Sequence, residues 1–411
     1  NTFIGWDRCT LTRGATDRKG KTKMTFTMTD AQQEIRDTIL RLCAQFDDDY
    51  WLEKDRVGGY PQELHTALAE GGWLGVAMPT EYGGAGLGIT EATIMMQAIA
   101  EAGGGASAAS AIHLNVFGLN PVVKFGTDEQ KERMLTPLIA GQQKPCFAVT
   151  EPTTGLDTTK LKTKAVKQGE RYVVNGQKVW ITTAQVADQM LLLARTTPLE
   201  DVEKPTEGLT LFYTKFDRDF LDIREIEKMG RKCVDSNELF IEGLPIPAED
   251  MIGQEGQGFR QILHGLNPER VMIAGECIGI ARNALKRAAE YAKERVVFGR
   301  PIGQNQGVQH PLAQCWAKVE AANLMVMHAA ALYDAGKPCG VEANAAKLLA
   351  AEAAVEATQT AQLTFGGFGY AKEYHVERLV REALLFKIVP ITPQLLLSFI
   401  AEKALGLPKS Y

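Results

Sequence analysis

The spacing of the hydrophobic residues changes twice along this 411-residue chain, and that order limits its fold more than any other feature. Up to about residue 141 the apolar residues recur at helical spacing, as Ile35, Ile39 and Leu42 do. Over the middle third, short apolar runs alternate with polar residues and are separated by turn signals. From about residue 259 the helical spacing returns. The order of helices, sheet and helices predicts an α+β protein of several domains.

The expected elements follow from these patterns. Helices are expected near residues 30–46 (with Asp30 as a cap), 61–70, 90–102 and 128–140. Strands are expected near residues 147–150, 160–167, 172–174, 179–182, 190–194, 209–216 and 239–241. The chain is expected to turn at Gly169 and at Asn175-Gly176, the second of which is a strong hairpin signal. Long helices near residues 259–295, 308–335, 341–364 and 376–405 predict an antiparallel bundle.

The expected domains are an N-terminal helical domain (24–143), a central antiparallel β domain (144–256) and a C-terminal four-helix bundle (257–411). Residues 1–23 differ from the rest, because they carry six Lys or Arg residues against two Asp and lack apolar periodicity. We interpret them as a cloning-derived or upstream-translated extension outside the fold. A mitochondrial-type presequence is the alternative, since the segment is basic.

Composition narrows the function. The net charge of −5 gives no reason to expect nucleic acid or an anionic membrane as a partner. No apolar run approaches the roughly 20 residues of a membrane span. The seven cysteines are widely spaced, without a CxxC pair or a Cys/His cluster, so neither a metal site nor a disulfide framework is expected. We expect reduced, buried thiols in an intracellular protein, cytoplasmic or, if the source is eukaryotic, in the mitochondrial matrix.

The common catalytic signatures are missing, since there is no GxSxG elbow, Walker loop or metal-spaced His pair. Two stretches of the middle third place an aromatic residue beside hydroxyls at a strand end: Phe147-Ala148-Val149-Thr150 and Val179-Trp180-Ile181-Thr182-Thr183. This pattern suits a planar heterocycle, which needs a stacking ring and hydrogen-bond donors. The alternative is a core Trp with Thr residues that simply populate strands.

Three stretches of the C-terminal third also carry chemistry. Arg295 and Arg300 lie near a glycine and can bind a pyrophosphate, and the glycine-rich turn at residues 365–370 lets a backbone approach a ligand closely. Glu269 stands beside Arg270 where a helix is expected to begin. The alternatives are a solvated charge run, a helix–helix turn and a helix start in which Asn267 is the N-cap and Glu269 an acidic first-turn residue.

Taken together, these pieces resemble the acyl-CoA dehydrogenase family from about Met24 to the C-terminus. The motifs that carry the resemblance are, in order, Pro79…Gly83-Gly84…Gly86, Thr150-Glu151-Pro152…Gly155…Asp157, Trp180-Ile181-Thr182, Lys228-Met229-Gly230, Gly256…Gly258-Phe259, Arg295…Phe298-Gly299 and Gly366-Gly367…Gly369 with Glu373-Tyr374. The resemblance implies an N-terminal helical domain, a central β domain, a C-terminal four-helix bundle, FAD as cofactor, and a homodimer or homotetramer.

Similarity to the family also implies roles for single positions. Residues that match one edge of the isoalloxazine ring of FAD are Phe147, Val149 and Thr150. Trp180 and Thr182 match residues that pack on this ring and hydrogen-bond near its N5 edge. Residues that match contacts to the ADP part of a neighbouring subunit's FAD are Arg295, Phe298, Gln306, Gly366 and Gly367. Thr392 and Gln394 match a further cofactor contact.

The catalytic base of many family members is a glutamate two residues before a threonine that Thr392 matches. This chain has Pro390 there, and proline has no acid–base chemistry. The isovaleryl and long-chain types instead carry the base on the first long helix of the bundle, immediately before an arginine. Glu269 and Arg270 match those positions, so the resemblance implies Glu269 as the base and Arg270 as a substrate-binding residue near the entrance.

The implied activity is FAD-dependent α,β-dehydrogenation of an acyl-CoA thioester to the enoyl-CoA, with the α-proton removed by Glu269 and the β-hydride passed to flavin N5. An electron-transferring flavoprotein is implied as the electron acceptor. Two alternatives stay open: a flavin oxidase or monooxygenase of the same fold on a non-CoA substrate, and a non-catalytic flavin-binding paralogue. The last is motivated by Pro390 and by Leu156 and Leu363, which depart from the family at a Ser and a Gln position. If a long helix runs through Glu269, Pro268 is expected at a kink or irregular turn inside it.

Overall fold

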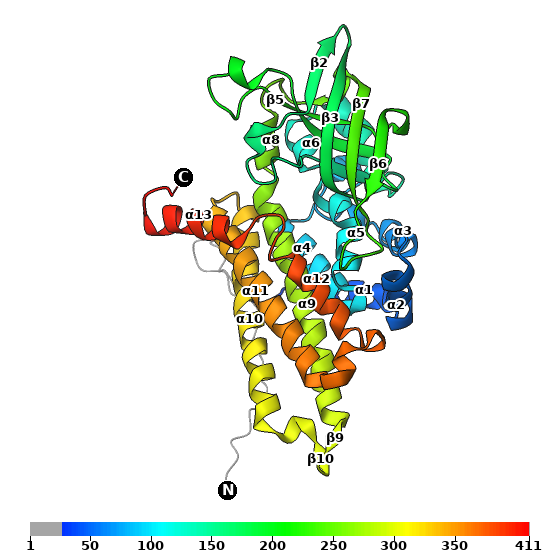
Figure 1. Cartoon of the computed structure of the whole chain (residues 1–411), viewed down its shortest axis with the longest axis vertical. Coiled ribbons are helices and arrows are strands. Elements are labelled where there is room, and N and C mark those ends of the chain that lie inside the picture. Colours follow the sequence, from blue (N-terminus) through cyan, green and yellow to red (C-terminus); the bar gives the residue numbers. More distant parts are fainter. Residues whose placement is uncertain (1–26, 411) are drawn as a thin grey trace.

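The computed structural model describes residues 27–410 and places a β-sheet at one end and a bundle of long helices at the other (Figure 1). Helices, sheet and helices follow one another along the chain, so the predicted α+β class and architecture are confirmed. The predicted extension over residues 1–23 lies outside the described residues. Within residues 27–410 no helix is both long and apolar enough to cross a membrane.

From residue 27 onward seven α-helices precede the sheet: α1 (Asp30–Cys43), α2 (Asp48–Val57), α3 (Gln62–Glu70), α4 (Ile89–Ile99), α5 (Gly105–Phe117), α6 (Asn120–Phe125) and α7 (Asp128–Ile139). The π-helical segment η3 (Ala100–Gly104) joins α4 to α5. The sequence patterns do not predict α2, α5 or α6. Helix α5 is rich in small residues and buried on almost every side, so it shows no apolar stripe. Thr29, rather than Asp30, is the N-cap of α1, since its hydroxyl accepts from the amide of Gln32 at 3.2 Å.

The middle of the chain forms one sheet of strand order β6-β7-β3-β2-β4-β5-β8, with β1 paired to β4 outside this path. The strands are β1 (Pro145–Ala148), β2 (Lys164–Gln168), β3 (Arg171–Thr182), β4 (Gln189–Arg195), β5 (Leu209–Lys215), β6 (Leu221–Glu225), β7 (Ser236–Pro247) and β8 (Met251–Ile252). The pairing is antiparallel except that β1 runs parallel to β4 and a single bridge between β2 and β4 is parallel.

The hairpin predicted at Asn175-Gly176 is wrong. Both residues lie inside β3, where the register against β7 shifts between Val174 and Gly176. The chain turns instead at Gly169, between β2 and β3, as the turn signal at that glycine predicts. Gly176 is needed for a close approach rather than for a turn, because a Cβ on it would lie 2.7 Å from the Cα of Thr163.

The C-terminal helices are α8 (Gly258–Leu263), α9 (Leu266–Glu294), α10 (Gln306–Asp334), α11 (Gly340–Phe365), α12 (Val376–Leu385) and α13 (Pro393–Leu405). Helices α9 to α12 lie side by side as the bundle (Figure 1). The short strands β9 (Val296–Val297) and β10 (Arg300–Pro301) connect α9 to α10 at the end of the bundle far from the sheet (Figure 1).

The helix predicted over residues 376–405 is interrupted at residues 386–392, between α12 and α13. Pro390 has no amide with which to continue a helix. Two carbonyls of the interrupted segment bond to the side chain of Lys347 in α11, whose Nζ donates to Phe386 at 2.7 Å and to Ile391 at 2.8 Å. A buried ammonium therefore compensates for the helix bonds that are missing here.

The helix predicted over residues 259–295 is also divided, at His264-Gly265. The irregular turn expected at Pro268 thus lies just before it, since α9 begins at Leu266 with Gly265 as its N-cap. The alternative in which Asn267 is the N-cap is wrong. Pro268 lacks the amide that would bond to the carbonyl of His264, which favours a break at this point.

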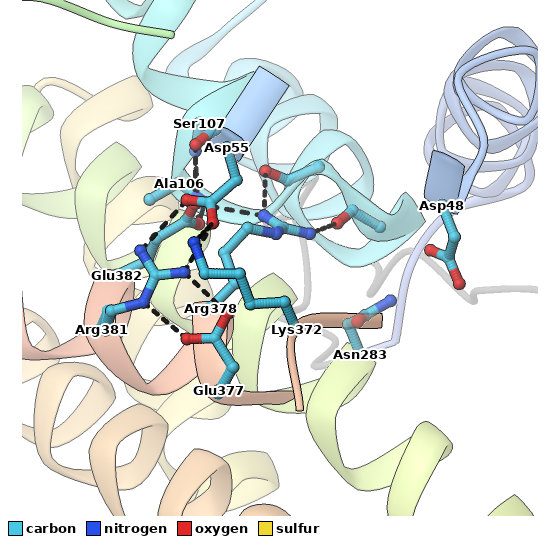
Figure 2. Close-up of polar contacts among 12 residues, drawn as sticks. Asp48, Asp55, Ala106, Ser107, Asn283, Lys372, Glu377, Arg378, Arg381 and Glu382 are labelled. Atoms are coloured by element: carbon cyan, nitrogen blue, oxygen red, sulfur yellow. Dashed lines mark hydrogen bonds and ion pairs between the residues drawn. The ribbon is translucent and has the colours of Figure 1, made fainter. Parts of the chain in front are cut away.

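A buried ion pair on α12 joins the bundle to the N-terminal helices (Figure 2). Arg378 donates to the carbonyls of Gly103 and Gly104, at 2.6 and 3.2 Å, where η3 ends. Glu382 accepts from the amide of Ala106 at 2.7 Å, where α5 begins. Each charge therefore meets a helix end of opposite partial charge. We call Arg378 and Glu382 the α12 clamp.

Cysteine pairing can be judged for the described residues alone. Six cysteines lie among them, and all six are free and buried: Cys43, Cys146, Cys233, Cys277, Cys315 and Cys339. This agrees with the expectation of reduced, buried thiols.

Candidate active site

The two stretches predicted to hold a planar heterocycle lie against each other in the sheet. Phe147 belongs to β1 and Thr150 follows it, while Trp180 and Thr182 end β3. The amide of Val179 donates to the carbonyl of Thr150 at 2.9 Å, which joins the two stretches directly. Side chains from both stretches therefore share one edge of the β domain.

Trp180 leaves the regular strand at a bulge. The register of β3 against β7 shifts between Lys178 and Ile181, and Trp180 has a left-handed backbone with φ of +61°. A non-glycine residue adopts this conformation at a cost, and such strain is concentrated at functional sites. The indole is 58% exposed, so the alternative of a core Trp is wrong. A large ring held out of the sheet is available for stacking.

The neighbouring residues divide into exposed and buried side chains. Phe147, Thr150 and Thr182 are each partly exposed beside the indole. The side chain of Val149 is only 6% exposed and packs into the core below the sheet, so a role for Val149 at a ligand rests on its main chain. Four of the five predicted ring contacts therefore present side chains at this edge.

Glu269 and Phe147 line the same small pocket, of about 20 Å³, between the sheet, α5 and the start of α9. The other residues around it are Leu114, Phe117, Gly118, Pro121, Ile262, Gly265 and Leu266. The walls are apolar apart from the Glu269 carboxyl. The structure thus joins the predicted base to the predicted heterocycle site, although 122 positions separate Phe147 from Glu269 in the sequence.

Burial raises the pKa of the Glu269 carboxyl above its ordinary value. The cations His113 and Arg270 act in the opposite direction, and the carboxylate of Glu276 adds to the increase. Arg270 is oriented by Asn267, whose Oδ1 accepts from Nη1 of Arg270 at 3.1 Å. A carboxylate that is costly to keep charged is a stronger base, so this setting suits proton abstraction.

A buried histidine–glutamate pair lies behind the pocket. Nδ1 of His113 on α5 is 2.7 Å from Oε1 of Glu276, which is two helical turns beyond Glu269 on α9. Burial disfavours the charged imidazole, but the Glu276 carboxylate raises the pKa of His113 above its ordinary value. The His113 ring meets the ring of Phe117, a wall of the pocket, edge to face at 6.2 Å between centroids.

The two candidate positions for the base lie in one region. Burial lowers the pKa of Lys347 to about 8, and the charge of Arg270 contributes to this decrease. The same Lys347 binds the carbonyl of Ile391, next to Pro390. Arg270, next to Glu269, and the segment around Pro390 therefore both interact with Lys347.

A second hollow, of about 470 Å³, lies at the far end of the bundle. It joins two of the stretches predicted to contact the ADP part of FAD, because Arg295 and the Gly366-Gly367 turn both line it. The guanidinium of Arg295 also lies over the ring of Phe368, 5.7 Å from its centroid. In the sequence, the alternatives for these stretches are a solvated charge run and a helix–helix turn. The fold brings an arginine and a glycine-rich backbone to one concave surface.

The remaining predicted cofactor residues lie near one or other of these places. Phe298 is fully exposed at the tip between β9 and β10, and Gln306 is exposed at the start of α10. Thr392 is the N-cap of α13 and Gln394 is exposed on its first turn. A Cβ built on Gly340 would lie 3.3 Å from the ring of Phe399 in α13 and 3.9 Å from Asn267 of α9, so α13 belongs to the Glu269 end of the bundle.

One chain does not bring the two sets together. Arg295 follows Glu269 by 26 residues, 25 of which belong to the uninterrupted helix α9, so about 39 Å separates them at 1.5 Å per residue. Figure 1 shows β9 and β10 at the opposite end of the bundle from the sheet. The Trp180 edge and the Arg295 hollow must therefore serve different ligand molecules or meet across two chains.

Sequence patterns do not indicate two buried ionic pairs of the site, His113–Glu276 and Lys178–Glu151. The Lys178–Glu151 pair could have been suspected from the sequence, because Lys178 is a charged residue within the otherwise apolar end of β3. Within residues 27–410 no group of three or more His, Cys, Asp or Glu residues is placed to hold a metal ion.

Comparison with known proteins identifies three family models along the chain. They are the acyl-CoA dehydrogenase N-terminal domain over residues 29–142, the middle domain over residues 146–244 and the C-terminal domain over residues 256–405. Together they cover most of the chain, in the order of the helices, the sheet and the bundle.

Single proteins agree with these models. The acyl-CoA dehydrogenase FadE12 of Mycobacterium tuberculosis is 36% identical over 396 residues, covering 95% of this chain and 100% of that protein. The subunit CarC of the caffeyl-CoA reductase–Etf complex of Acetobacterium woodii is 35% identical over 343 residues, covering 83% of this chain and 89% of CarC. The structure of butyryl-CoA dehydrogenase from Megasphaera elsdenii superposes with a TM-score of 0.88 at 32% identity, covering 93% of this chain and all of that one.

Proposed function

The chain belongs to the acyl-CoA dehydrogenase family, whose members are oxidoreductases, and we propose that it oxidises an acyl-CoA thioester with Glu269 as its base. One observation carries the assignment of the base. Glu269 shares an apolar pocket with Phe147 at the predicted flavin edge, while Pro390 stands at the other position where family members carry a glutamate.

In this proposal Glu269 removes the α-proton of the acyl group. The apolar walls formed by Leu114, Phe117 and Phe147 keep water from the carboxylate, and burial raises the pKa of Glu269 and so makes it a stronger base. Arg270, held by Asn267, keeps a positive charge beside the base near the entrance. FAD, when bound, supplies the acceptor for the β-hydride.

The described residues fit FAD at two places. Trp180 is held out of the sheet beside the hydroxyls of Thr150 and Thr182, which suits a flat ring with polar edges. At the other end of the bundle, Arg295 and the Gly366-Gly367 turn form a concave site suited to a pyrophosphate. Because about 39 Å of helix separates Glu269, which shares a pocket with Phe147 of the ring site, from Arg295, we propose that each FAD is held by two chains, which requires at least a homodimer.

The electron acceptor we propose is an electron-transferring flavoprotein. The relative CarC supports this, since it is named as a subunit of a complex with Etf. A protein acceptor also matches the exposure of Trp180, which leaves one edge of the β domain open beside the proposed ring site.

The proposal is tested by replacing Glu269 with Gln in purified, FAD-loaded protein. Anaerobic mixing with short, branched, medium and long acyl-CoAs should bleach the flavin of the wild type with at least one of them. Glu269→Gln should retain its FAD but bleach about 10²–10⁴-fold more slowly, the usual contribution of a general base. The matched control is Glu290→Gln, which changes an exposed glutamate of the same helix and should leave the rate unchanged.

Full bleaching of Glu269→Gln by the acyl-CoA that reduces the wild type would rule out Glu269 as the base. A wild type that binds FAD but is reduced by no acyl-CoA would refute the proposed substrate class. Rapid oxygen uptake by the reduced wild type, without an added flavoprotein acceptor, would favour the oxidase alternative.

A further inference from the structure

Lys178 is a fully buried lysine of the β domain, with 0% of its side chain exposed. Its Nζ donates to the carbonyl of Leu193 in β4 at 2.8 Å, to the carbonyl of Val149 at 3.0 Å and to Oε1 of Glu151 at 3.1 Å. An ammonium has three donors, so every donor of Lys178 has a protein partner. The side chain therefore ties β3, β4 and the segment after β1 to one point.

Glu151 completes this network from the other side. Its carboxylate is 4% exposed and accepts from the amide of Lys162 at 2.7 Å and from the amide of Thr163 at 2.9 Å. The two charges are thus compensated by each other and by four main-chain groups from three segments. Such an arrangement is rigid, because removing any partner leaves a buried charge unpaired.

The network lies where the regular hydrogen-bond ladder is missing. Strand β1 pairs with β4 and not with β3, so the carbonyl of Val149 has no partner in a ladder with β3. Strand β3 has its bulge directly after Lys178, between Lys178 and Ile181. Lys178 thus supplies, with its side chain, a bond to the Val149 carbonyl that no ladder between β1 and β3 provides, directly before the bulge that β3 makes against β7.

The residues on either side of the network are those of the proposed ring site. Val149, whose carbonyl accepts from Lys178, is followed by Thr150, whose carbonyl accepts from the amide of Val179 at 2.9 Å. Trp180 comes two residues after Lys178, at the bulge. A displacement of Lys178 would move both sides of the ring site relative to each other, while the more distant Arg295 hollow would stay in place.

We propose that Lys178, held by Glu151, is a positioning residue for FAD that fixes the segment Phe147–Thr150 against the Trp180 bulge at the separation the flavin ring requires. This inference rests on the proposed FAD site. It concerns binding and orientation of the cofactor, so it is tested without any acyl-CoA.

The experiment measures FAD binding to apoprotein by fluorescence titration, together with the visible circular dichroism of the bound flavin and the melting temperature of the apoprotein. Lys178→Met keeps the length of the side chain but removes all three bonds. We expect the dissociation constant for FAD to rise about 10–100-fold, as when a residue that orients the ligands of a metal is lost. The dichroism of the bound flavin should change as well, because the ring is held differently.

The matched control is Arg195→Met, which removes another buried cation of the same sheet. Arg195 is 6% exposed and donates to the carbonyls of Thr159 at 2.6 Å and Leu161 at 3.2 Å, and none of its side-chain bonds reaches Phe147–Thr150 or the Trp180 bulge. This variant should lower the melting temperature as Lys178→Met does, but leave the dissociation constant and the dichroism of the flavin unchanged.

Two results would overturn the proposal. One is a Lys178→Met apoprotein that melts lower but binds FAD with wild-type affinity and dichroism, which would make Lys178 structural only. The other applies if Lys178→Met does not fold. Glu151→Gln, which removes the charge but keeps one acceptor oxygen, should then weaken FAD binding, and unchanged binding would refute the inference. Failure of acyl-CoA to reduce the wild type would refute the proposed activity but leave this result standing.

Discussion

Replacing Arg378 of the α12 clamp with Met should destabilise the protein by about 3–5 kcal/mol, the usual cost of removing one member of a buried ion pair. Arg378 is 2% exposed and bonds to Gly103, Gly104 and Glu382, so its loss leaves two carbonyls and a carboxylate without these donors. The carboxylate still accepts from the amide of Ala106, which places the expected cost toward the lower end of this range. Urea unfolding followed by far-UV circular dichroism gives the free energy of unfolding.

A double-mutant cycle separates the pair from its surroundings. The change Glu382→Leu, alone and combined with Arg378→Met, should show a coupling of about 1–3 kcal/mol, because the two residues share one buried network. Lys318→Met, which breaks the exposed pair with Glu356, is the control and should leave the unfolding curve unchanged. A cost below about 1 kcal/mol for Arg378→Met, typical of a surface pair, would refute the reasoning.

Two further predictions concern pH. Flavin reduction by acyl-CoA, followed by stopped-flow absorbance, should fall as pH falls through a value above the ordinary range of glutamate, because burial raises the pKa of Glu269. His113→Gln should move this limb to higher pH, since the His113 cation lowers that pKa; an unmoved limb would contradict the assignment. Burial also lowers the pKa of His65 from 6.5 to about 4. Between these pH values His65 is protonated in the unfolded chain but neutral in the folded one. The free energy of unfolding should therefore fall by up to about 3 kcal/mol between pH 6.5 and pH 4, and the melting temperature should fall with it. His65→Phe should reduce this dependence of the melting temperature on pH.

Periodicity was sufficient to predict the order of helices, sheet and helices, because an amphipathic element records its buried face in its own sequence. It fails where an element is buried on every side. Helix α5 shows this, since its opening run of Gly, Ala and Ser has no polar face. The turn signal at Asn175-Gly176 fails for a similar reason, because the glycine is needed for the close approach of Thr163 and not for a reversal of the chain.

The candidate site was predictable only in part. The aromatic and hydroxyl residues of β1 and β3 stand together in the sequence, and Glu269 was indicated by resemblance to a family together with Pro390. The pairing of His113 with Glu276 and of Arg378 with Gly103 joins residues more than 160 positions apart, so local patterns contain no trace of it. The left-handed backbone of Trp180 likewise lies at a bulge of β3 against β7, whose paired residues are more than 50 positions apart.

Helix α9 is continuous between Glu269 and the Arg295 hollow, so its residue count sets both the distance and the rotation between them. Inserting one residue between Glu269 and Arg295 would lengthen the helix by about 1.5 Å and rotate its far end by about 100°, because an α-helix has 3.6 residues per turn. Arg295 would then face away from the Gly366-Gly367 turn while Glu269 stayed in its pocket. Homologous sequences should therefore carry insertions and deletions in loops such as residues 197–207 but keep the number of residues in α9 constant.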